Sequence, residues 1–137
     1  MGSGPRLASV VVFVRDLEAS VAFYRELLRL KVTARTATAA LLMSGEEFQL
    51  YLRAVGAGAE RPLGGIGVQY VIWTADGFDG LRHCETVLKA RAAHVSTWEA
   101  DGFHLVEGRD PSGVPLIVAY PGPDETAGHE IMSRIYA

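Results

Sequence analysis

The chain has 137 residues, of which 49% are hydrophobic and 21% are charged. This length and composition are typical of a single globular domain and exclude a disordered tail protein. Thirteen Lys and Arg residues against sixteen Asp and Glu residues give a net charge of −3, which argues against a surface for nucleic acid.

The first half of the chain is predicted to run strand, helix, strand, strand, strand. Leu7–Val14 is rich in β-branched residues and suits a buried strand, and Asp16 follows it as a helix N-cap. Apolar residues recur at three- and four-residue steps from Leu17 to Leu30, which predicts an amphipathic helix. Three short strands are predicted next, at Lys31–Arg35, Ala39–Met43 and Glu47–Arg53.

The second half is predicted to repeat this order. A strand at Gly67–Thr74 precedes a helix that Asp76 or Asp79 caps and that ends near Arg91. Asp110-Pro-Ser-Gly113 has the composition of a turn. The remaining strands are predicted at Ala93–Trp98, Phe103–Gly108 and Val114–Tyr120.

The spacing of the helix caps indicates a duplicated unit. Asp16 and Asp76 lie 60 residues apart, and each follows a strand and precedes a helix. We therefore expect one domain, residues 6–121, built from two modules at 6–54 and 67–121. Residues 55–66, rich in glycine, form a linker, and residues 122–137 form a C-terminal tail.

Strand parity separates residues that face the helices from residues that do not, because side chains alternate between the two faces of a sheet. One set is large and apolar and should pack against the helices. The other set mixes aromatic residues with Ser, Gln and Arg, and its aromatics Tyr51 and Trp73 favour ligand binding over a merely solvated face. Its members are Ser9, Val11, Phe13, Gln49, Tyr51, Arg53, Gln69, Val71, Trp73, Pro115, Ile117 and Ala119.

The run Val10-Val-Val-Phe-Val-Arg-Asp-Leu-Glu-Ala-Ser-Val-Ala-Phe-Tyr24, together with Asp110-Pro-Ser-Gly113, resembles the glyoxalase/bleomycin-resistance/extradiol-dioxygenase family, the vicinal oxygen chelate superfamily. The resemblance covers about Leu7 to Tyr120. It implies an α+β fold in which two βαβββ modules form a cupped mixed sheet, often in a homodimer. The fold hosts metalloenzymes, oxygenases and metal-free drug-binding proteins, so the fold alone does not set the function.

The resemblance also implies four positions for a divalent metal, one on the first and one on the last strand of each module. Counted from the aspartate before each helix and from the Asp-Pro-Ser-Gly turn, these positions hold Ser9, Gln49, Gln69 and Ile117. The set lacks every imidazole and carboxylate that divalent metals favour, and Ile117 has no lone pair. We therefore expect no metal and no cofactor.

Other residues suggest further chemistry and a location. His104, Glu107 and Tyr51 are candidates for acid–base catalysis, and Trp73 and Trp98 are candidates for stacking on a planar ligand. Cys84, the single cysteine, cannot form an internal disulfide, which favours the cytoplasm. The longest apolar run, around Ala8–Val14, is far shorter than the ~20 residues of a membrane helix.

The sequence therefore predicts a metal-free protein that sequesters a small, partly aromatic natural product or antibiotic, as in self-resistance. The expected ligand-binding residues are Ser9, Phe13, Gln49, Tyr51, Gln69, Trp73, Trp98 and Ile117. The alternative is an enzyme of the same family, a lyase, isomerase or dioxygenase-like protein, with a non-standard metal or none. A metalloenzyme with other ligands and a scaffold subunit that has lost its site also stay open, as does the identity of the ligand.

Overall fold

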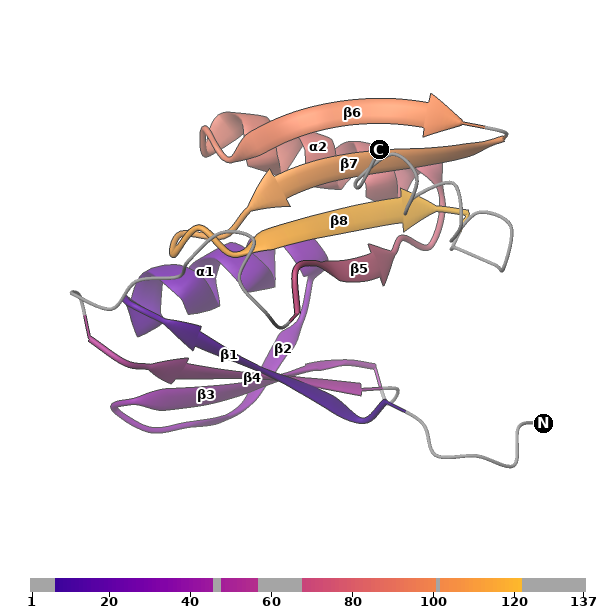
Figure 1. Ribbon diagram of the computed structural model, residues 1–137. Coiled ribbons are helices and arrows are strands. Elements are labelled where there is room, and N and C mark those ends of the chain that lie inside the picture. Colours follow the sequence, from indigo (N-terminus) through magenta and orange to yellow (C-terminus); the bar gives the residue numbers. More distant parts are fainter. Residues whose placement is uncertain (1–6, 46–47, 57–67, 101, 122–137) are drawn as a thin grey trace. The chain divides into compact units, whose positions relative to one another are not determined.

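The computed structural model describes residues 7–45, 48–56, 68–100 and 102–121, and the chain divides into two units, residues 1–60 and 61–137 (Figure 1). The expected tail and the expected linker beyond Gly56 lie outside the described residues. Glu47 and Gly67, which the sequence assigned to strands, also lie outside them.

Unit 1 contains one helix and a mixed sheet of four strands. Its elements are β1 (Ser9–Val14), α1 (Leu17–Leu28), β2 (Lys31–Arg35), β3 (Ala39–Ser44) and β4 (Phe48–Ala54). The strands lie in the order β1-β4-β3-β2, with β1 parallel to β4 and the other neighbours antiparallel. The predicted elements of this half are confirmed to within two residues at each end.

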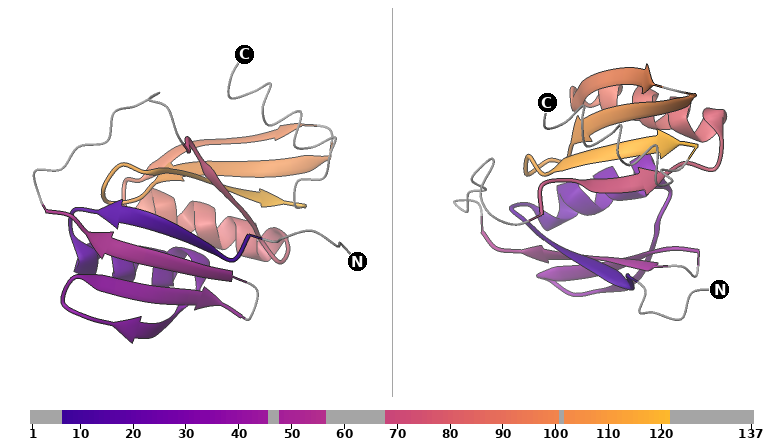
Figure 2. Two further views of the ribbon diagram at one scale, coloured as in Figure 1. Left: turned by 60° about the horizontal axis from the view of Figure 1, so that its bottom comes forward. Right: turned by 45° about the vertical axis from the view of Figure 1, so that its right-hand side comes forward.

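Helix α1 begins where a side chain satisfies its free backbone N–H groups. Asp16 is the N-cap, and its Oδ1 accepts a hydrogen bond of 3.0 Å from the backbone N–H of Ala19. The helix ends at Arg29, which adopts the left-handed conformation with φ of 56°. The apolar stripe that includes Val21, Phe23 and Leu27 is buried, and the helix packs on β3 and β4 (Figure 2, left).

Unit 2 repeats the same topology. Its elements are β5 (Val71–Thr74), α2 (Phe78–Ala90), β6 (His94–Ala100), β7 (Phe103–Arg109) and β8 (Pro115–Tyr120). The strand order β5-β8-β7-β6, with β5 parallel to β8, matches that of unit 1 strand for strand. The expected α+β fold of two βαβββ modules is therefore confirmed, and α2 lies behind the sheet of unit 2 in Figure 1.

The start of α2 differs from the prediction. Its N-cap is Gly77, which provides no side-chain hydrogen bond, so neither Asp76 nor Asp79 caps the helix. Asp79 instead pairs with Arg82 at 3.3 Å on the exposed surface. The N-caps Asp16 and Gly77 are 61 residues apart, not 60. This offset of one residue in the alignment of the two modules reverses the prediction of which β5 side chains face the helix.

Two local features fix the core of unit 2. The buried turn residue Asp110 accepts hydrogen bonds on Oδ1 from the backbone N–H groups of Ser112 (2.8 Å) and Val114 (2.9 Å), which confirms the predicted turn. On β7, Gly108 lies directly under the fully buried Leu88 of α2. A side chain at Gly108 would occupy the space that Leu88 fills, so glycine allows the helix to pack this closely on the sheet.

Of the helices formed by the described residues, none combines the length and the apolar composition needed to cross a membrane.

Candidate functional site

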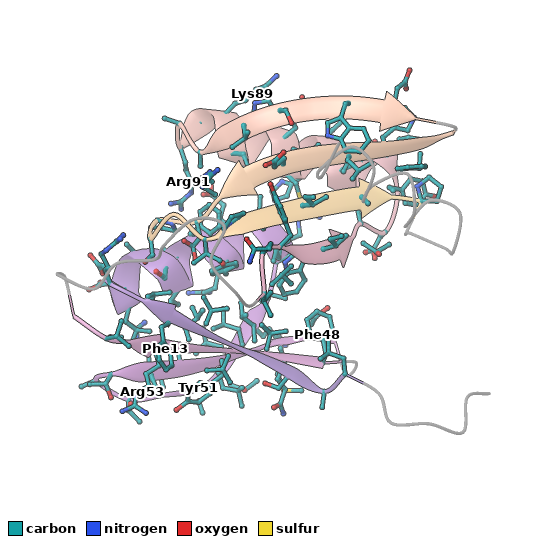
Figure 3. All side chains as sticks on the ribbon, in the orientation of Figure 1. Phe13, Phe48, Tyr51, Arg53, Lys89 and Arg91 are labelled. Carbon is teal, nitrogen blue, oxygen red and sulfur yellow. The ribbon has the colours of Figure 1, made fainter. Side chains whose placement is uncertain are left out.

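The far face of unit 1 is the sheet face opposite α1, and its residues are Ser9, Val11, Phe13, Leu41, Met43, Gln49, Tyr51 and Arg53. The register places Ser9 opposite Gln49 and Val11 opposite Tyr51, which agrees with the predicted parity of these strands. Val11 and Phe13 are 59% and 60% exposed. Tyr51 and Arg53 project from the side of the sheet away from α1 (Figure 3).

In unit 2 the strand register corrects the predicted parity of β5. Ile72, rather than Trp73, lies opposite Ile117 on the sheet, and Trp73 lies opposite Val118. Val118 pairs with Val106, two residues from Gly108, so Trp73 belongs to the face that packs against α2, where it is 8% exposed. The sequence placed Trp73 on the opposite face because it aligned Asp76, instead of Gly77, with Asp16.

The same correction moves one of the expected polar positions. Gln69 precedes β5 and is half-buried, whereas Tyr70 lies 61 residues after Ser9 and so occupies the equivalent position in the second module. Tyr70 is also two residues before Ile72, and side chains two residues apart project to the same side of a strand. Its hydroxyl reaches Glu107, the register partner of Ile117.

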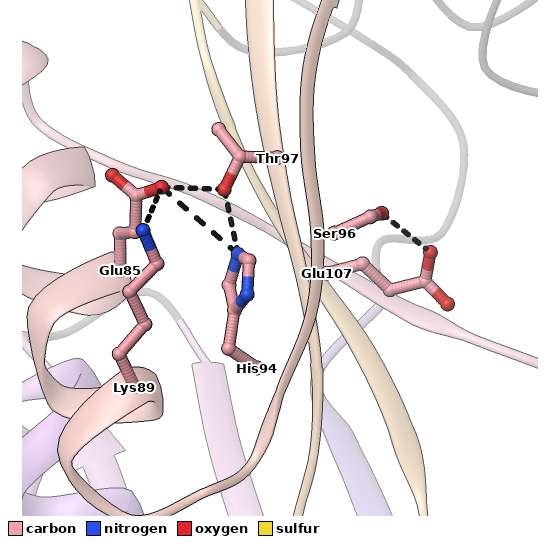
Figure 4. Close-up of polar contacts among 6 residues, drawn as sticks. All are labelled: Glu85, Lys89, His94, Ser96, Thr97 and Glu107. Atoms are coloured by element: carbon pink, nitrogen blue, oxygen red, sulfur yellow. Dashed lines mark hydrogen bonds and ion pairs between the residues drawn. The ribbon is translucent and has the colours of Figure 1, made fainter.

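The far face of unit 2, the sheet face opposite α2, carries a polar group that we call the Glu107 cluster, formed by Glu107, Tyr70 and Ser96. The Tyr70 hydroxyl donates to Glu107 Oε2 at 3.1 Å, and the Ser96 hydroxyl donates to Glu107 Oε1 at 3.3 Å. Ser96 and Glu107 are direct partners across β6 and β7. Figure 4 shows their contact on the side of the sheet away from α2.

Apolar side chains surround the Glu107 cluster. Phe103, Leu105, Ile117 and Ala119 form a buried group, with the half-buried Tyr70 and Trp98 packed against it. Trp98 lies two residues after Ser96 on β6, and its ring is 6.4 Å from that of Phe103 in an edge-to-face arrangement. A half-buried carboxylate therefore lies beside a half-buried indole on a face whose centre is apolar, with Tyr70, Ser96 and Arg109 as its other polar members.

The three candidates for acid–base catalysis are not brought together within unit 2. His104 lies on the α2 side of the sheet, where its ring is 4.9 Å from that of Phe78 and its Nδ1 is 3.0 Å from Glu99. Glu107 projects from the opposite face, and Tyr51 belongs to unit 1. A direct proton relay from His104 to Glu107 is excluded by this placement.

A second polar cluster joins α2 to β6. The Thr97 hydroxyl donates to Glu85 Oε2 at 2.6 Å, and Lys89 Nζ lies 3.3 Å from the same oxygen. His94 Nε2 is 2.6 Å from Thr97 Oγ1 (Figure 4). Because the single hydroxyl proton of Thr97 goes to the carboxylate, Nε2 of His94 must carry the proton in this contact. The cluster fastens the helix to the sheet edge and faces away from the Glu107 cluster.

This helix–sheet cluster predicts a pH dependence of stability. The hydrogen bond from Thr97 is the main cause that holds the pKa of Glu85 below its usual range, against the effect of burial. The hydrogen bond and the charge of Lys89 and the charge of His94 lower this pKa further. Since the folded-state pKa is depressed, the stabilisation is present above the unfolded-state value and disappears as the pH falls through the folded-state value. We expect Thr97→Val to raise the pKa of Glu85, measured by NMR titration of its carboxyl group.

Thr97→Ser, which keeps the hydroxyl, is the control and should leave the pKa of Glu85 low. A wild-type pKa as high as that of an exposed glutamate, or an unchanged pKa in the Thr97→Val variant, would contradict this account of the cluster.

The residues at the implied metal positions do not suit a divalent metal. In unit 1 they are Ser9 and Gln49, a directly opposed pair of neutral side chains. In unit 2 they are Ile117 and, after the correction, the phenol of Tyr70, which donates a hydrogen bond to Glu107. Within the described ranges no three His, Cys, Asp or Glu side chains are arranged to hold a metal ion.

The fold and these side chains define a class of protein: two βαβββ modules whose far faces carry aromatic, amide and hydroxyl groups. The chain belongs to the Glyoxalase/Bleomycin resistance protein/Dioxygenase superfamily, whose sequence model matches residues 6–118. This confirms the family resemblance. A comparison with curated protein sequences finds no significant match.

Solved structures share the fold at low sequence identity. A glyoxylase/bleomycin resistance protein/dioxygenase domain from Frankia sp. EAN1pec is 22% identical, with a TM-score of 0.74 over 85% of this chain and 98% of that one. A lactoylglutathione lyase from Agrobacterium tumefaciens is 18% identical, with a TM-score of 0.66 over 86% and 95%. A glyoxalase/dioxygenase from Nostoc punctiforme is 15% identical, with a TM-score of 0.72 over 83% and 89%.

Sequence reasoning missed Tyr70 and Ser96. For Tyr70 the correct alignment of the modules comes from the first helical residues, Leu17 and Phe78, which are 61 residues apart, and the start of α2 at Phe78 is a result of the structure. Ser96 had no sequence signal. Its pairing with Glu107 depends on an irregularity between His94 and Ser96 that shifts the register of β6.

Proposed function

We propose that this protein binds a small, partly aromatic organic molecule without a divalent metal, and that it sequesters a natural product or antibiotic in this way. The observation that carries the proposal is the chemistry at the positions where the family pattern calls for metal ligands. Serine, glutamine, tyrosine and isoleucine replace imidazole and carboxylate there. Such groups orient a neutral or aromatic ligand by hydrogen bonds and contact, and they bind divalent metals weakly.

The far face of unit 2 supports the aromatic part of the proposal. Trp98 is half-buried beside the apolar group of Phe103, Leu105 and Ile117, so part of its ring is available to a planar molecule. Stacking on an indole contributes about 0.5–1.5 kcal/mol beyond the area buried. The far face of unit 1 carries neutral hydrogen-bonding groups of its own, on Ser9, Gln49 and Tyr51.

The two tryptophans make the proposal testable by fluorescence, because they lie on opposite faces of one sheet. Trp73 faces α2 and Trp98 faces away from it. We expect a panel of planar aromatic antibiotics to include a compound that changes the emission of the Trp73→Phe variant, in which Trp98 remains. The same compound should leave the emission of the Trp98→Phe variant nearly unchanged, since the remaining Trp73 does not contact it.

Metal analysis of the same preparation tests the other half of the proposal. Stoichiometric manganese, iron, nickel or zinc that survives dialysis would contradict metal independence. An emission change carried by Trp73 alone would place the ligand elsewhere. Mass spectrometry of small molecules that copurify with the protein would identify the natural ligand directly.

A family-type enzyme that works without the usual metal is the second candidate, and the Glu107 carboxylate favours it. Two hydroxyls orient this carboxylate on an apolar face, as a general base requires. The two candidates differ in the fate of the ligand. A binding protein returns the copurified molecule chemically unchanged after prolonged incubation, whereas an isomerase or lyase converts it.

The proposal includes a homodimer in the cytoplasm. The dimer is proposed because family members commonly pair, and the location because the single cysteine of the chain, Cys84, is buried and forms no internal disulfide. Light scattering of the purified protein measures the oligomeric state.

A further inference from the structure

We propose that the ligand of this protein carries an amine or another organic cation, and that Glu107 binds it while Trp98 contacts its aromatic part. This inference rests on the proposed function, since it names the charge of the molecule bound at the far face of unit 2. The carboxylate of Glu107 has an unusual position for a charged group.

Glu107 is half-buried on a face whose other members are mostly apolar. Its register neighbours are Ser96 on β6 and Ile117 on β8, and Ile117 in turn lies opposite Ile72 on β5. Glutamate side chains carry a negative charge at neutral pH, and partial removal of such a charge from water is unfavourable without a compensating partner. The charge of Glu107 therefore calls for a compensating partner.

The partners that Glu107 has are neutral. Tyr70 and Ser96 each donate one hydrogen bond, one to each carboxylate oxygen. Among the residues that the structure describes, no Lys, Arg or His lies within ion-pair distance of Glu107. The two hydroxyls fix the orientation of the carboxylate and leave each oxygen with further capacity to accept hydrogen bonds.

Glu85, on the opposite side of the sheet, differs from Glu107 because it has a cationic partner. Its carboxylate also accepts a hydroxyl, that of Thr97, but Lys89 lies 3.3 Å away and balances its charge. The Glu107 cluster has the hydroxyl groups without such an ion pair: Arg109, two residues further along the same side of β7, directs its guanidinium to the backbone oxygen of Gly113 at 3.5 Å. An ammonium group on the ligand supplies what is missing, and its charge-assisted hydrogen bonds are about twice as strong as neutral ones.

The neighbouring residues set the shape of such a ligand. Trp98 projects from the same face as Ser96, two residues further along β6, so the indole and the carboxylate are adjacent. Ile72, 40% exposed, adds an apolar contact on the β5 side. The matching molecule is a planar aromatic group joined to an amine by a short link.

Two probes that differ only in charge test the inference. At pH 7, 1-naphthylmethylamine is an ammonium ion and 1-naphthylmethanol is neutral, and both have the same ring and link. We expect the wild-type protein to bind the amine about tenfold more tightly, with NMR shift changes at the Trp98 indole N–H. Glu107→Gln, which keeps the size and an acceptor oxygen for one of the two hydroxyls, should bring the two affinities close together.

Glu99→Gln is the matched control. It also removes one negative charge, from β6 instead of β7. Because Glu99 pairs with His104 on the α2 side of the sheet, the preference for the amine should persist. Equal binding of both probes to the wild-type protein would overturn the cation while leaving an aromatic ligand in place. A preference that survives in Glu107→Gln would overturn the role of Glu107. If neither probe binds at millimolar concentration, the aromatic site itself is contradicted together with the inference.

Discussion

Replacing Gly108 with alanine is expected to lower the free energy of unfolding by roughly 1–3 kcal/mol, the usual effect of forcing an extra carbon into a packed core. A Cβ at this position would lie 2.6 and 2.8 Å from the two δ-carbons of Leu88 and 3.0 Å from the backbone oxygen of Ala93. Leu88 is fully buried, so its side chain cannot move aside easily. The Ala93 oxygen is also held, because it accepts a hydrogen bond from the Arg109 N–H.

The measurement is urea unfolding of the wild type, Gly108→Ala, Leu88→Ala and the double variant. Since the new methyl group clashes mainly with Leu88, the two substitutions should be non-additive, and Gly108→Ala should cost less where Leu88 is already truncated. Gly77→Ser serves as a control, because its position is extended and open and a serine there adds an N-cap hydroxyl. A Gly108→Ala variant as stable as the wild type would mean that α2 packs less closely on β7.

The order of the elements could be predicted from the sequence because each signal for it is local. The β-branched run before Asp16, the apolar spacing after it and the Asp110-Pro-Ser-Gly113 turn each act within a few residues. The family pattern depends on the same signals. The duplicated topology therefore followed from the repetition of these signals in the second half of the chain.

The placement of Trp73 could not be predicted safely, because strand parity is sensitive to one residue. Asp76 is as good an N-cap as Asp16 by residue type, yet α2 begins after Gly77. An error of one position moves every side chain of β5 to the other face. Trp73 therefore lies outside the expected site, and Tyr70 lies in it.

The Glu107 cluster could not be predicted from the sequence, for a different reason. Its members come from three segments: Tyr70 lies before β5, Ser96 on β6 and Glu107 on β7. Their meeting depends on the pairing of β6 with β7 and on the irregularity near His94, which are properties of the assembled sheet. The sequence identified Glu107 and His104 as separate candidates by residue type, and the sheet places them on opposite faces.

Introducing a carboxylate at Ile117 is expected to have the largest effect on this chain. Ile117 occupies a position that the family pattern assigns to a metal ligand, is 1% exposed and lies directly opposite Glu107. Side chains opposed in this way have Cβ atoms about 4.5–5.5 Å apart. Ile117→Glu therefore buries a second negative charge beside the first, and we expect it to lower the free energy of unfolding at pH 7 by about 3–5 kcal/mol.

The sign of the pH dependence distinguishes charge from lost packing. Two adjacent carboxylates in an apolar setting share a proton, so one pKa of the pair in the variant rises above its unfolded-state value. The folded variant then regains stability as the pH falls below that raised pKa. Ile117→Gln, polar and of similar size but uncharged, should lose less stability at pH 7 and show no recovery in acid.

Added metal then makes Ile117→Glu informative about function. Because the new carboxylate lies opposite Glu107, the pair could itself bind a divalent metal, so the test uses Ile117→Glu in a Glu107→Gln background. The neighbouring position in unit 2 holds the neutral oxygen of Tyr70, and we expect manganese, nickel or zinc to leave this double variant as unstable as before. A ligand that binds only the folded protein would stabilise it in proportion to the logarithm of its concentration above the dissociation constant. Recovery of stability with metal in the double variant would therefore show that a single carboxylate separates this chain from a metal-binding protein, against the metal independence proposed for it.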